Sequence, residues 1–336
     1  MSAFKRDKDG NWTLDTVPKN WHQTYADAML KCFNDLDQLF AKAQETCAFE
    51  FILSLLAIRE ITADSGWFPF DTLHQNFRAI NSVKKKFDKE ENTHVHLLLY
   101  GLIVEASEPY EMLANLMNVI EGDRAKNNFP PTLNKRGDEV EWKPIDKIRN
   151  LQKRARQLGI ANSLELFDDF YDNQLRNAVF HCSYTVYDND IRLFTGSTRR
   201  VIGHEEKHKL INGALAYYEV FTTLINQYIA DYDEPIAIEP HPDFKTHNDQ
   251  TIKLMIRKGH GVVGIKDNWS PAQLRAGFIP FRLSKITRHE QWLLNKYPDI
   301  DIFPKDRTPA INRLLKCIPK PLKGYILKFI QKNFGY

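Results

Sequence analysis

Apolar residues recur at intervals of three and four along most of the first 232 residues, and this spacing constrains the fold more than any other feature. Residues three or four apart share one face of an α-helix, so each such stretch predicts a helix with one buried side. The spacing is clearest in residues 21–40 and 205–230. It also predicts helices at residues 49–61, 72–87, 93–121, 144–158 and 163–181, with a kink or break at Pro109 in the longest of them.

Two further patterns complete the expected fold. The sequence YTVYDNDIRLF alternates around Asp188, Asn189 and Asp190, which predicts a β-hairpin. Residues 233–249 contain three prolines and no helical spacing, and we expect a linker or domain edge there. The fold class expected is therefore mainly α. It comprises a helical bundle with a small inserted hairpin over residues 1–232, and a smaller α+β C-terminal module over residues 233–336.

Composition narrows the class of protein. Hydrophobic residues make up 43% of the chain and charged residues 26%, as in an ordinary globular protein. The longest apolar runs are shorter than the roughly 18 to 20 residues that a membrane span needs. No apolar segment follows the charged N-terminus, so we expect no signal peptide and a cytoplasmic location. The four cysteines stand apart without metal-ligand spacing, and we expect free thiols, no metal and no cofactor.

The positive charge is concentrated at the C-terminus. Residues 305–336 contain eight lysines and arginines against one acid, and their apolar residues recur with helical spacing. Basic amphipathic helices of this kind bind acidic membrane surfaces, RNA phosphates or a groove on a partner protein. A pair of terminal helices docked on the C-terminal module, with solvated lysines, is an equally open interpretation.

The stretch RNAVFH places Arg176, Asn177 and His181 within six positions near the end of an expected helix. On a continuous helix Arg176 and His181 diverge by about 140°, so they would meet only if the helix ends near Phe180 or two copies pair. A purely structural role is the alternative. Asp172 would then form an ion pair with Arg176 four residues later, and His181 would interact with the helix C-terminus.

Three other residues are supporting candidates for a site. Glu105 lies in the apolar sequence LIVEAS, where a carboxylate needs a partner or has a raised pKa. We expect it to pair with a lysine, an arginine or a backbone group, with a direct catalytic role as the alternative. Asp172 and Tyr184 flank the RNAVFH stretch and are the other two.

RNAVFH is similar to the Arg-x4-6-His signature of the HEPN superfamily (higher eukaryotes and prokaryotes nucleotide-binding), in which a polar residue, often Asn, follows the arginine. The resemblance implies a bundle of four or five helices with this motif late in the bundle. It also implies a metal-independent endoribonuclease in which two motif copies meet across a homodimer interface, with Arg176, Asn177 and His181 in the site. A toxin or phage-defence role, RNA as substrate, and an antitoxin or other protein partner follow from the same resemblance.

The three residue types suit RNA cleavage by its own 2′-hydroxyl. Imidazole moves protons near neutral pH, and a guanidinium holds a phosphate as negative charge builds up on it. Asn177 would orient the histidine or the phosphate. The alternative, from another class, is a HEPN-like binding or scaffold protein without catalysis, which would use the bundle groove for a nucleotide, RNA or protein.

Overall fold

The computed structural model describes residues 4–8, 10–19, 21–56, 69–83, 89–195, 198–232, 237–238, 252–257 and 261–266. The described part is mainly helical with small antiparallel sheets, as expected. The chain divides into two compact units, one of Met1–Ile61 and Phe68–Tyr232 and the other of Thr62–Trp67 and Asp233–Tyr336. The basic tail at residues 305–336 lies outside the described residues. No described helix is both long and apolar enough to cross a membrane.

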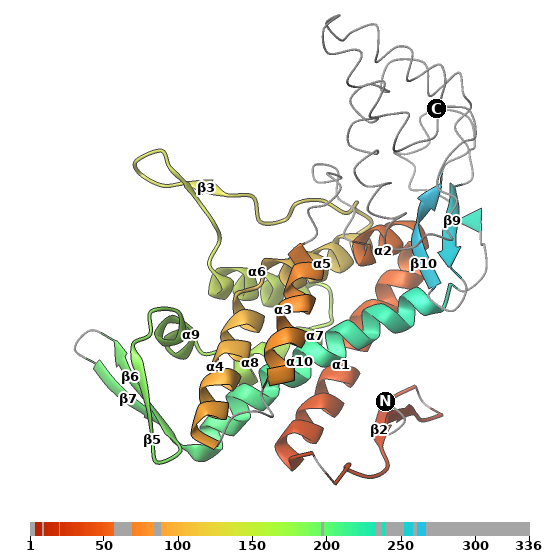
Figure 1. Ribbon diagram of the computed structural model, residues 1–336. Helices are drawn as coiled ribbons and strands as arrows, with labels where there is room; N and C mark the ends of the chain where they lie inside the picture. The colour runs from red at the N-terminus through yellow and green to blue at the C-terminus, as the bar shows by residue number, and fades with distance from the viewer. Residues whose placement is uncertain are drawn as a thin grey trace, which may run out of the picture. The chain divides into compact units, whose positions relative to one another are not determined.

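Two long helices, α1 (Gln23–Thr46) and α10 (His204–Ala230), lie side by side through the first unit (Figure 1). They are roughly 36 and 40 Å long at 1.5 Å per residue. Both were expected from the spacing of their apolar residues. Their shared interface is aromatic: the ring of Phe40 on α1 lies 6.1 Å from Phe221 and 5.4 Å from Tyr228, both on α10. Several of the other described helices pack against this pair.

Helices α2 to α5 follow α1 in the chain. Their bounds are α2 Ala48–Leu55, α3 Pro69–Val83, α4 Lys89–Glu105 and α5 Ser107–Ile120. The break expected within residues 93–121 is confirmed, but it falls at Ala106 rather than at Pro109. Pro109 sits in the first turn of α5, where the backbone N–H that proline lacks would have no partner within the helix. Proline therefore marks the start of the second helix.

The next segment corrects the sequence expectation. The helix expected over residues 144–158 is present as α6 (Pro144–Gln157). Over residues 163–181 we expected one helix, whereas the chain forms three short ones, α7 (Asn162–Glu165), α8 (Phe167–Phe170) and α9 (Asn173–Phe180). Ser163 lies inside α7 and is not an N-cap.

The cause of the break before α9 is local. Asp172 has an extended backbone (φ −125°, ψ 111°), and its carboxylate accepts the N–H of Leu175 at 2.7 Å as an N-cap. The buried hydroxyl of Tyr100 on α4 accepts the N–H of Asp172 at 2.9 Å and donates to the carbonyl of Phe170 at 3.1 Å. These bonds satisfy backbone groups that a continuous helix would have used, so α9 starts afresh at Asn173.

Glycine allows α10 to approach α8 closely. A Cβ atom added at Gly213 would lie 2.7 Å from the Cβ of Phe170, closer than side chains tolerate. The rings of Phe167, Phe170 and Tyr217 pack together at this crossing, with centroids 5.1 to 5.5 Å apart. The segment leading into α9 is therefore fixed against the central helix.

The described residues of the first unit form three small antiparallel sheets. They pair β1 (Phe4–Arg6) with β2 (Trp12–Leu14), β3 (Thr132–Leu133) with β4 (Glu139–Val140), and β5 (Tyr184–Tyr187), β6 (Asp190–Thr195) and β7 (Thr198–Ile202) in that order. The expected hairpin is β5–β6, whose turn residues Asp188 and Asn189 both have positive φ. The β1–β2 hairpin and strand β7 were not anticipated.

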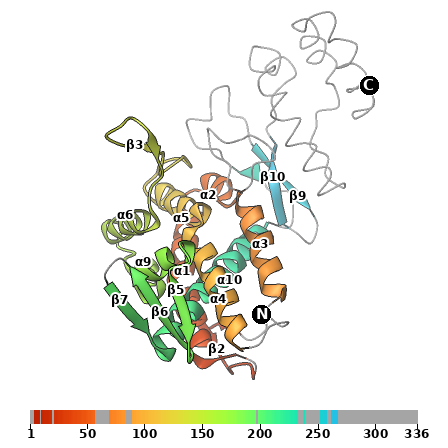
Figure 2. The same ribbon diagram turned by 60° about the vertical axis from the view of Figure 1, so that its left-hand side comes forward.

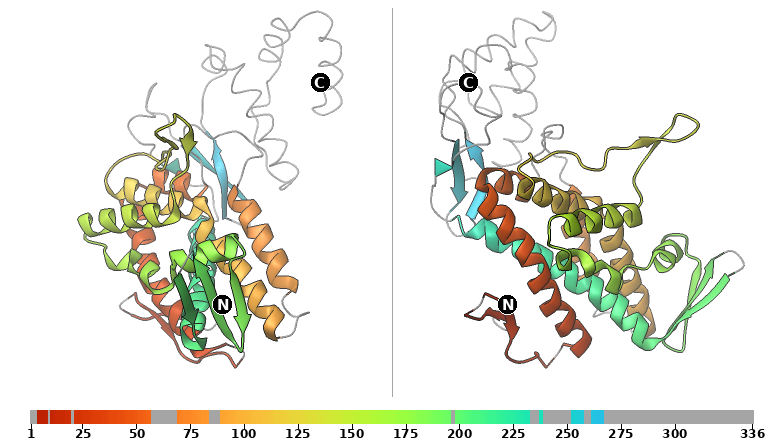
Figure 3. Two further views of the ribbon diagram at one scale, coloured as in Figure 1. Left: turned by 90° about the vertical axis from the view of Figure 1, so that its left-hand side faces the viewer. Right: turned by 180° about the vertical axis from the view of Figure 1, so that it is seen from behind.

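The β5–β6–β7 sheet lies at one end of the bundle, beside α9 and near the start of α4 and of α10 (Figures 1 and 2). The two further views in Figure 3 show the same placement. The sheet is tied to the end of α9, because the N–H of Phe194 donates to the carbonyl of Ser183 at 2.9 Å.

The described part of the second unit is a three-stranded antiparallel sheet in the order β10-β9-β8. Its strands are β8 (Ala237–Ile238), β9 (Ile252–Arg257) and β10 (Gly261–Lys266), with an irregularity in register between Val262 and Gly264. Strands were expected here as part of the α+β module. The helices expected after them lie outside the described residues.

Candidate functional site

One face of α4 carries His94, Leu98, Gly101 and Glu105 at spacings of four, three and four residues, so these residues form a stripe along the helix. Helix α9 and the start of β5 lie along this stripe (Figure 1). The stripe spans about 16 Å at 1.5 Å per residue. We call the contact the α4–α9 seam, and it consists of His94, Leu98, Gly101, Glu105, Arg176, Phe180 and Tyr184.

At one end of the seam Arg176 forms an ion pair with Glu105. The Arg176 Nε donates to Glu105 Oε2 at 2.5 Å, and one Nη also contacts this oxygen. The other Nη donates to the Asn177 side-chain oxygen at 2.8 Å, and the guanidinium carbon lies 5.5 Å from the Phe180 ring centroid. The expectation that Glu105 would pair with a charged or backbone group is confirmed.

The pair lies at the protein surface without being fully solvated. The Arg176 side chain is 20% exposed and the Glu105 side chain 41% exposed. Arginine has five N–H donors, and the contacts to Glu105 and Asn177 use three of them. Among the contacts of the described residues, two N–H groups on the Nη atoms are therefore left for another oxyanion.

In the middle of the seam α9 contacts α4 closely at Gly101. A Cβ added there would lie 3.0 Å from Val179 Cγ1 and 3.4 Å from the Phe180 ring, so even a methyl group would require these side chains to shift. The Phe180 ring and Leu98, one turn before Gly101, are both exposed, although they are large and apolar. The seam thus combines a charged end with an uncovered apolar centre.

At the other end of the seam the His94 Nδ1 and the Tyr184 hydroxyl lie 3.1 Å apart, within hydrogen-bonding distance. Their ring centroids are 5.7 Å apart. Burial raises the pKa of Tyr184, so its hydroxyl stays protonated near neutral pH. Tyr184 was a supporting candidate, whereas His94 was not assigned to the site.

Helix α9 ends at Phe180, and His181 is its C-cap residue. The next residue, Cys182, has φ +50°, and the N–H of Ser183 donates to the carbonyl of Ala178 at 2.9 Å. These are features of a Schellman motif, which turns the chain out of the helix. The imidazole of His181 is exposed, and among the described contacts no hydrogen bond or ion pair links it to Arg176. The helix end that a shared site requires is therefore present, but one protomer does not bring the two side chains into contact.

The expected ion pair between Asp172 and Arg176 is wrong. Asp172 caps α9, and its Oδ2 accepts a hydrogen bond from Arg200 on β7 at 2.6 Å. Arg200 also pairs with Glu206. Burial opposes the charge on Arg200, but its bonds to Asp172 and Glu206 outweigh that effect and raise its pKa. Because α9 starts after Asp172, this residue positions the start of the helix and does not pair with Arg176.

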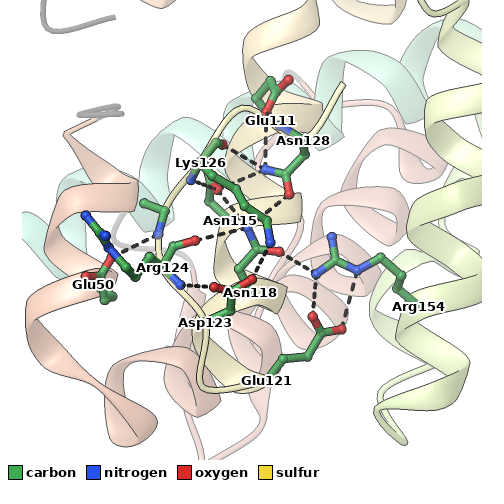
Figure 4. A network of polar contacts seen from close by, with 11 residues as sticks. Glu50, Glu111, Asn115, Asn118, Glu121, Asp123, Arg124, Lys126, Asn128 and Arg154 are labelled. Atoms are coloured by element: carbon green, nitrogen blue, oxygen red, sulfur yellow. Dashed lines mark hydrogen bonds and ion pairs between the residues drawn. The ribbon is translucent and has the colours of Figure 1, made fainter. Parts of the chain in front are cut away.

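A second polar cluster, at the C-terminal end of α5, has a structural role (Figure 4). Glu50 accepts the backbone N–H of Ala125, Glu111 accepts those of residues 128 and 129, and Asn115 accepts that of residue 126, at 2.9 to 3.1 Å. Arg154 on α6 donates to Asn118 and pairs with Glu121. These polar side chains serve to hold the loop after α5.

Sequence reasoning missed three residues that shape the site. Tyr100 and Arg200 hold the start of α9, and His94 contacts Tyr184. A signal for His94 was the spacing of the α4 stripe, which matches one helix face. A signal for Arg200 was the pair of β-branched residues that ends TRRVI, which favours a third strand. Nothing local pointed to the bonds of Tyr100, because its partners lie 70 and 72 residues further along the chain.

Comparisons with family models, curated proteins and solved structures find no match to this chain. A functional assignment therefore depends on the seam and on the short motif within it.

Proposed function

We propose that the α4–α9 seam, together with Asn177 and His181 on the same motif, is the active site of a metal-independent endoribonuclease of the HEPN type, which acts as a homodimer in the cytoplasm. The observation that carries the proposal is the end of α9 at Phe180. It leaves His181 exposed at the helix terminus, while Arg176, just over one turn earlier, keeps two N–H donors for a phosphate. The residue types match the requirements of phosphodiester cleavage at neutral pH.

In this mechanism the 2′-hydroxyl of the RNA attacks the adjacent phosphorus as a base removes its proton. The 5′-oxygen leaves with a proton supplied by an acid, and a 2′,3′-cyclic phosphate remains. Two copies of His181, one from each protomer, serve as the base and the acid. The Arg176 guanidinium binds the phosphate oxygens as charge builds up, and Asn177 and Glu105 hold that guanidinium in place.

The exposed apolar side chains support a dimer. Leu98 and Phe180 lie in the middle of the seam beside the motif, where a second copy would cover them. Pairing of two seams would bring together the two motif copies of the dimer, one from each protomer. A role as a toxin or in phage defence, with an antitoxin partner, belongs to the same proposal.

One observation favours the second candidate function, a non-catalytic protein that binds a nucleotide, RNA or protein through the bundle. Arg176 is already neutralised by Glu105 and packs on the Phe180 ring. An arginine held in this way joins α4 to α9, and that structural role requires no catalysis.

An assay with purified full-length protein separates the two functions. Wild-type protein and the Arg176→Ala, His181→Ala double variant would be incubated with a panel of mixed RNAs in EDTA. We expect the wild type to cleave RNA, and the double variant to lose at least about a hundredfold in rate, as is typical when proton-transfer and oxyanion-stabilising groups are removed.

Controls keep the result interpretable. His204→Ala removes an exposed histidine from the first turn of α10, outside the seam, and should cleave at the wild-type rate. Circular dichroism would establish that all variants are folded. Equal cleavage by the wild type and the double variant, or no cleavage by the wild type across the panel, would refute the nuclease proposal.

A further inference from the structure

The two faces of the β5–β6–β7 sheet differ sharply. Ile191, Leu193 and Ile202 point to one face and are fully buried against the bundle. The opposite face, which we call the outer face, carries large side chains in contact with solvent: Tyr187 is 61% exposed, Phe194 44% and Val201 57%. In Figure 2 the three strands stand in front of the helices. A small sheet with two aromatic rings facing water is unusual unless a partner covers them.

Arginines lie among these rings. Strand register places Arg192 opposite Val201, and Arg199 opposite Phe194, on the outer face. The Arg192 guanidinium carbon lies 4.3 Å from the centroid of the Tyr187 ring. Asp190 also lies on this face. Burial lowers the pKa of Lys207, and the nearby Asp190 carboxylate opposes that shift. Arg192 and Arg199 therefore give the outer face a positive charge.

We propose that the outer face of the β5–β6–β7 sheet binds single-stranded RNA. Unpaired bases stack on Tyr187 and Phe194, while Arg192 and Arg199 contact the phosphates. A duplex does not fit this chemistry, because its bases are stacked on one another and their faces are not free. The choice of RNA rests on the proposed function, whereas the stacking surface does not.

Charge favours this occupant over a second copy of the chain. Two outer faces packed against each other would bring four arginines together, which is unfavourable without counter-charges. A polyanion with flat bases matches both the charge and the rings. The sheet is joined to the end of α9 through the bond between Phe194 and Ser183, so RNA on this face runs close to the motif.

Fluorescence anisotropy with a labelled 12-nucleotide single-stranded RNA tests the inference. The full-length protein would carry His181→Ala, so that the probe is not cut. We expect Tyr187→Ala and Phe194→Ala each to weaken binding about tenfold, the range found for loss of base stacking, and Phe194→Trp to retain it. Arg192→Ala with Arg199→Ala should lower the slope of log affinity against log salt by about 1 to 2.

Matched controls and alternative probes make the test decisive. Leu133→Ala removes an exposed apolar side chain from β3, and Arg149→Ala with Lys153→Ala removes two exposed charges from α6; both should bind as the parent does. The duplex of the same sequence should bind at least tenfold more weakly. Single-stranded DNA that binds as tightly as RNA would still support the stacking surface.

The outcomes separate this inference from the proposed nuclease activity. If outer-face variants lose RNA binding while the wild type cleaves nothing, the binding surface stands and the nuclease proposal fails. If the parent binds no single strand, or the outer-face variants bind as the parent does, the inference is refuted. A dimer that dissociates on Phe194→Ala, with no RNA binding by the parent, would assign the face to self-association instead.

Discussion

Arg176 is the residue on which the proposed chemistry depends most, and its surroundings explain how it can serve two purposes. Glu105 and Asn177 use three of its N–H groups, which removes the freedom of a long side chain before any ligand arrives. The remaining N–H groups, one on each Nη atom, are held in place with the rest of the planar guanidinium. The pair gives only limited stability, because both side chains contact solvent and exposed ion pairs contribute about 0 to 1 kcal/mol.

Asp35 on α1 illustrates how burial affects an acid in this core. Its Oδ2 is buried and accepts no hydrogen bond from the described residues. Burial raises the pKa of Asp35 to about 6, because its effect is larger than the opposing effect of the Lys31 charge. Because the native state then binds this proton more tightly than the unfolded chain, the free energy of unfolding should fall as pH rises from about 4 to about 6.

We predict that Asp35→Asn raises the free energy of unfolding at pH 7 by about 1 to 2 kcal/mol, a value reduced for partial solvent exposure. The gain should disappear below pH 3.8, where the native carboxyl is already protonated. Urea denaturation of both proteins at several pH values measures the difference. A gain of the same size at all pH values, or none at pH 7, would contradict this explanation.

At the scale of elements, the end of α9 is held by an unusual residue. Cys182 adopts φ +50° at the position after the C-cap, where glycine is the common choice because it has no Cβ. A residue with a Cβ atom is sterically strained in this conformation. The Schellman hydrogen bonds nevertheless form, and they direct the chain from His181 into β5.

Substitution of Cys182 tests this arrangement. We expect Cys182→Gly to raise the free energy of unfolding by about 0.5 to 1 kcal/mol, because relief of strain exceeds the extra freedom of glycine in the unfolded chain. Cys182→Val should lower it by more than 1 kcal/mol, since a β-branched side chain tolerates positive φ poorly. Thermal denaturation of the three proteins ranks them. The reverse order would show that the left-handed turn is not the feature that ends α9.

Elements with strong local signals were predictable. The apolar spacing of α1 and α10 and the turn residues of the β5–β6 hairpin each point to one structure. The separate helix α9 was missed because its start depends on Tyr100, a residue 72 positions away. Asp172 itself was a usable local signal, since aspartate is a favoured N-cap. The sequence predicted that Glu105 would pair with a basic residue or a backbone group. It did not identify Arg176 as the partner, because the two residues lie 71 positions apart in the chain.

At the scale of the whole molecule, the first unit brings three chemical surfaces to one region. The motif helix α9, the α4 stripe and the β5–β6–β7 sheet are all linked by hydrogen bonds or close packing. The arrangement suits an enzyme that holds an RNA strand on the sheet and cuts it at the seam. The bundle fixes these surfaces relative to one another, which is what positioning a substrate requires.

The most direct test of the central claim is the chemical nature of the products. The wild-type protein would be incubated in EDTA with an RNA and with the same sequence carrying 2′-O-methyl groups, and the ends would be identified by mass spectrometry. We expect cleavage of the unmodified RNA alone, with 2′,3′-cyclic phosphate and 5′-hydroxyl ends. Cleavage of the methylated strand, 5′-phosphate ends, or no cleavage of either would contradict it.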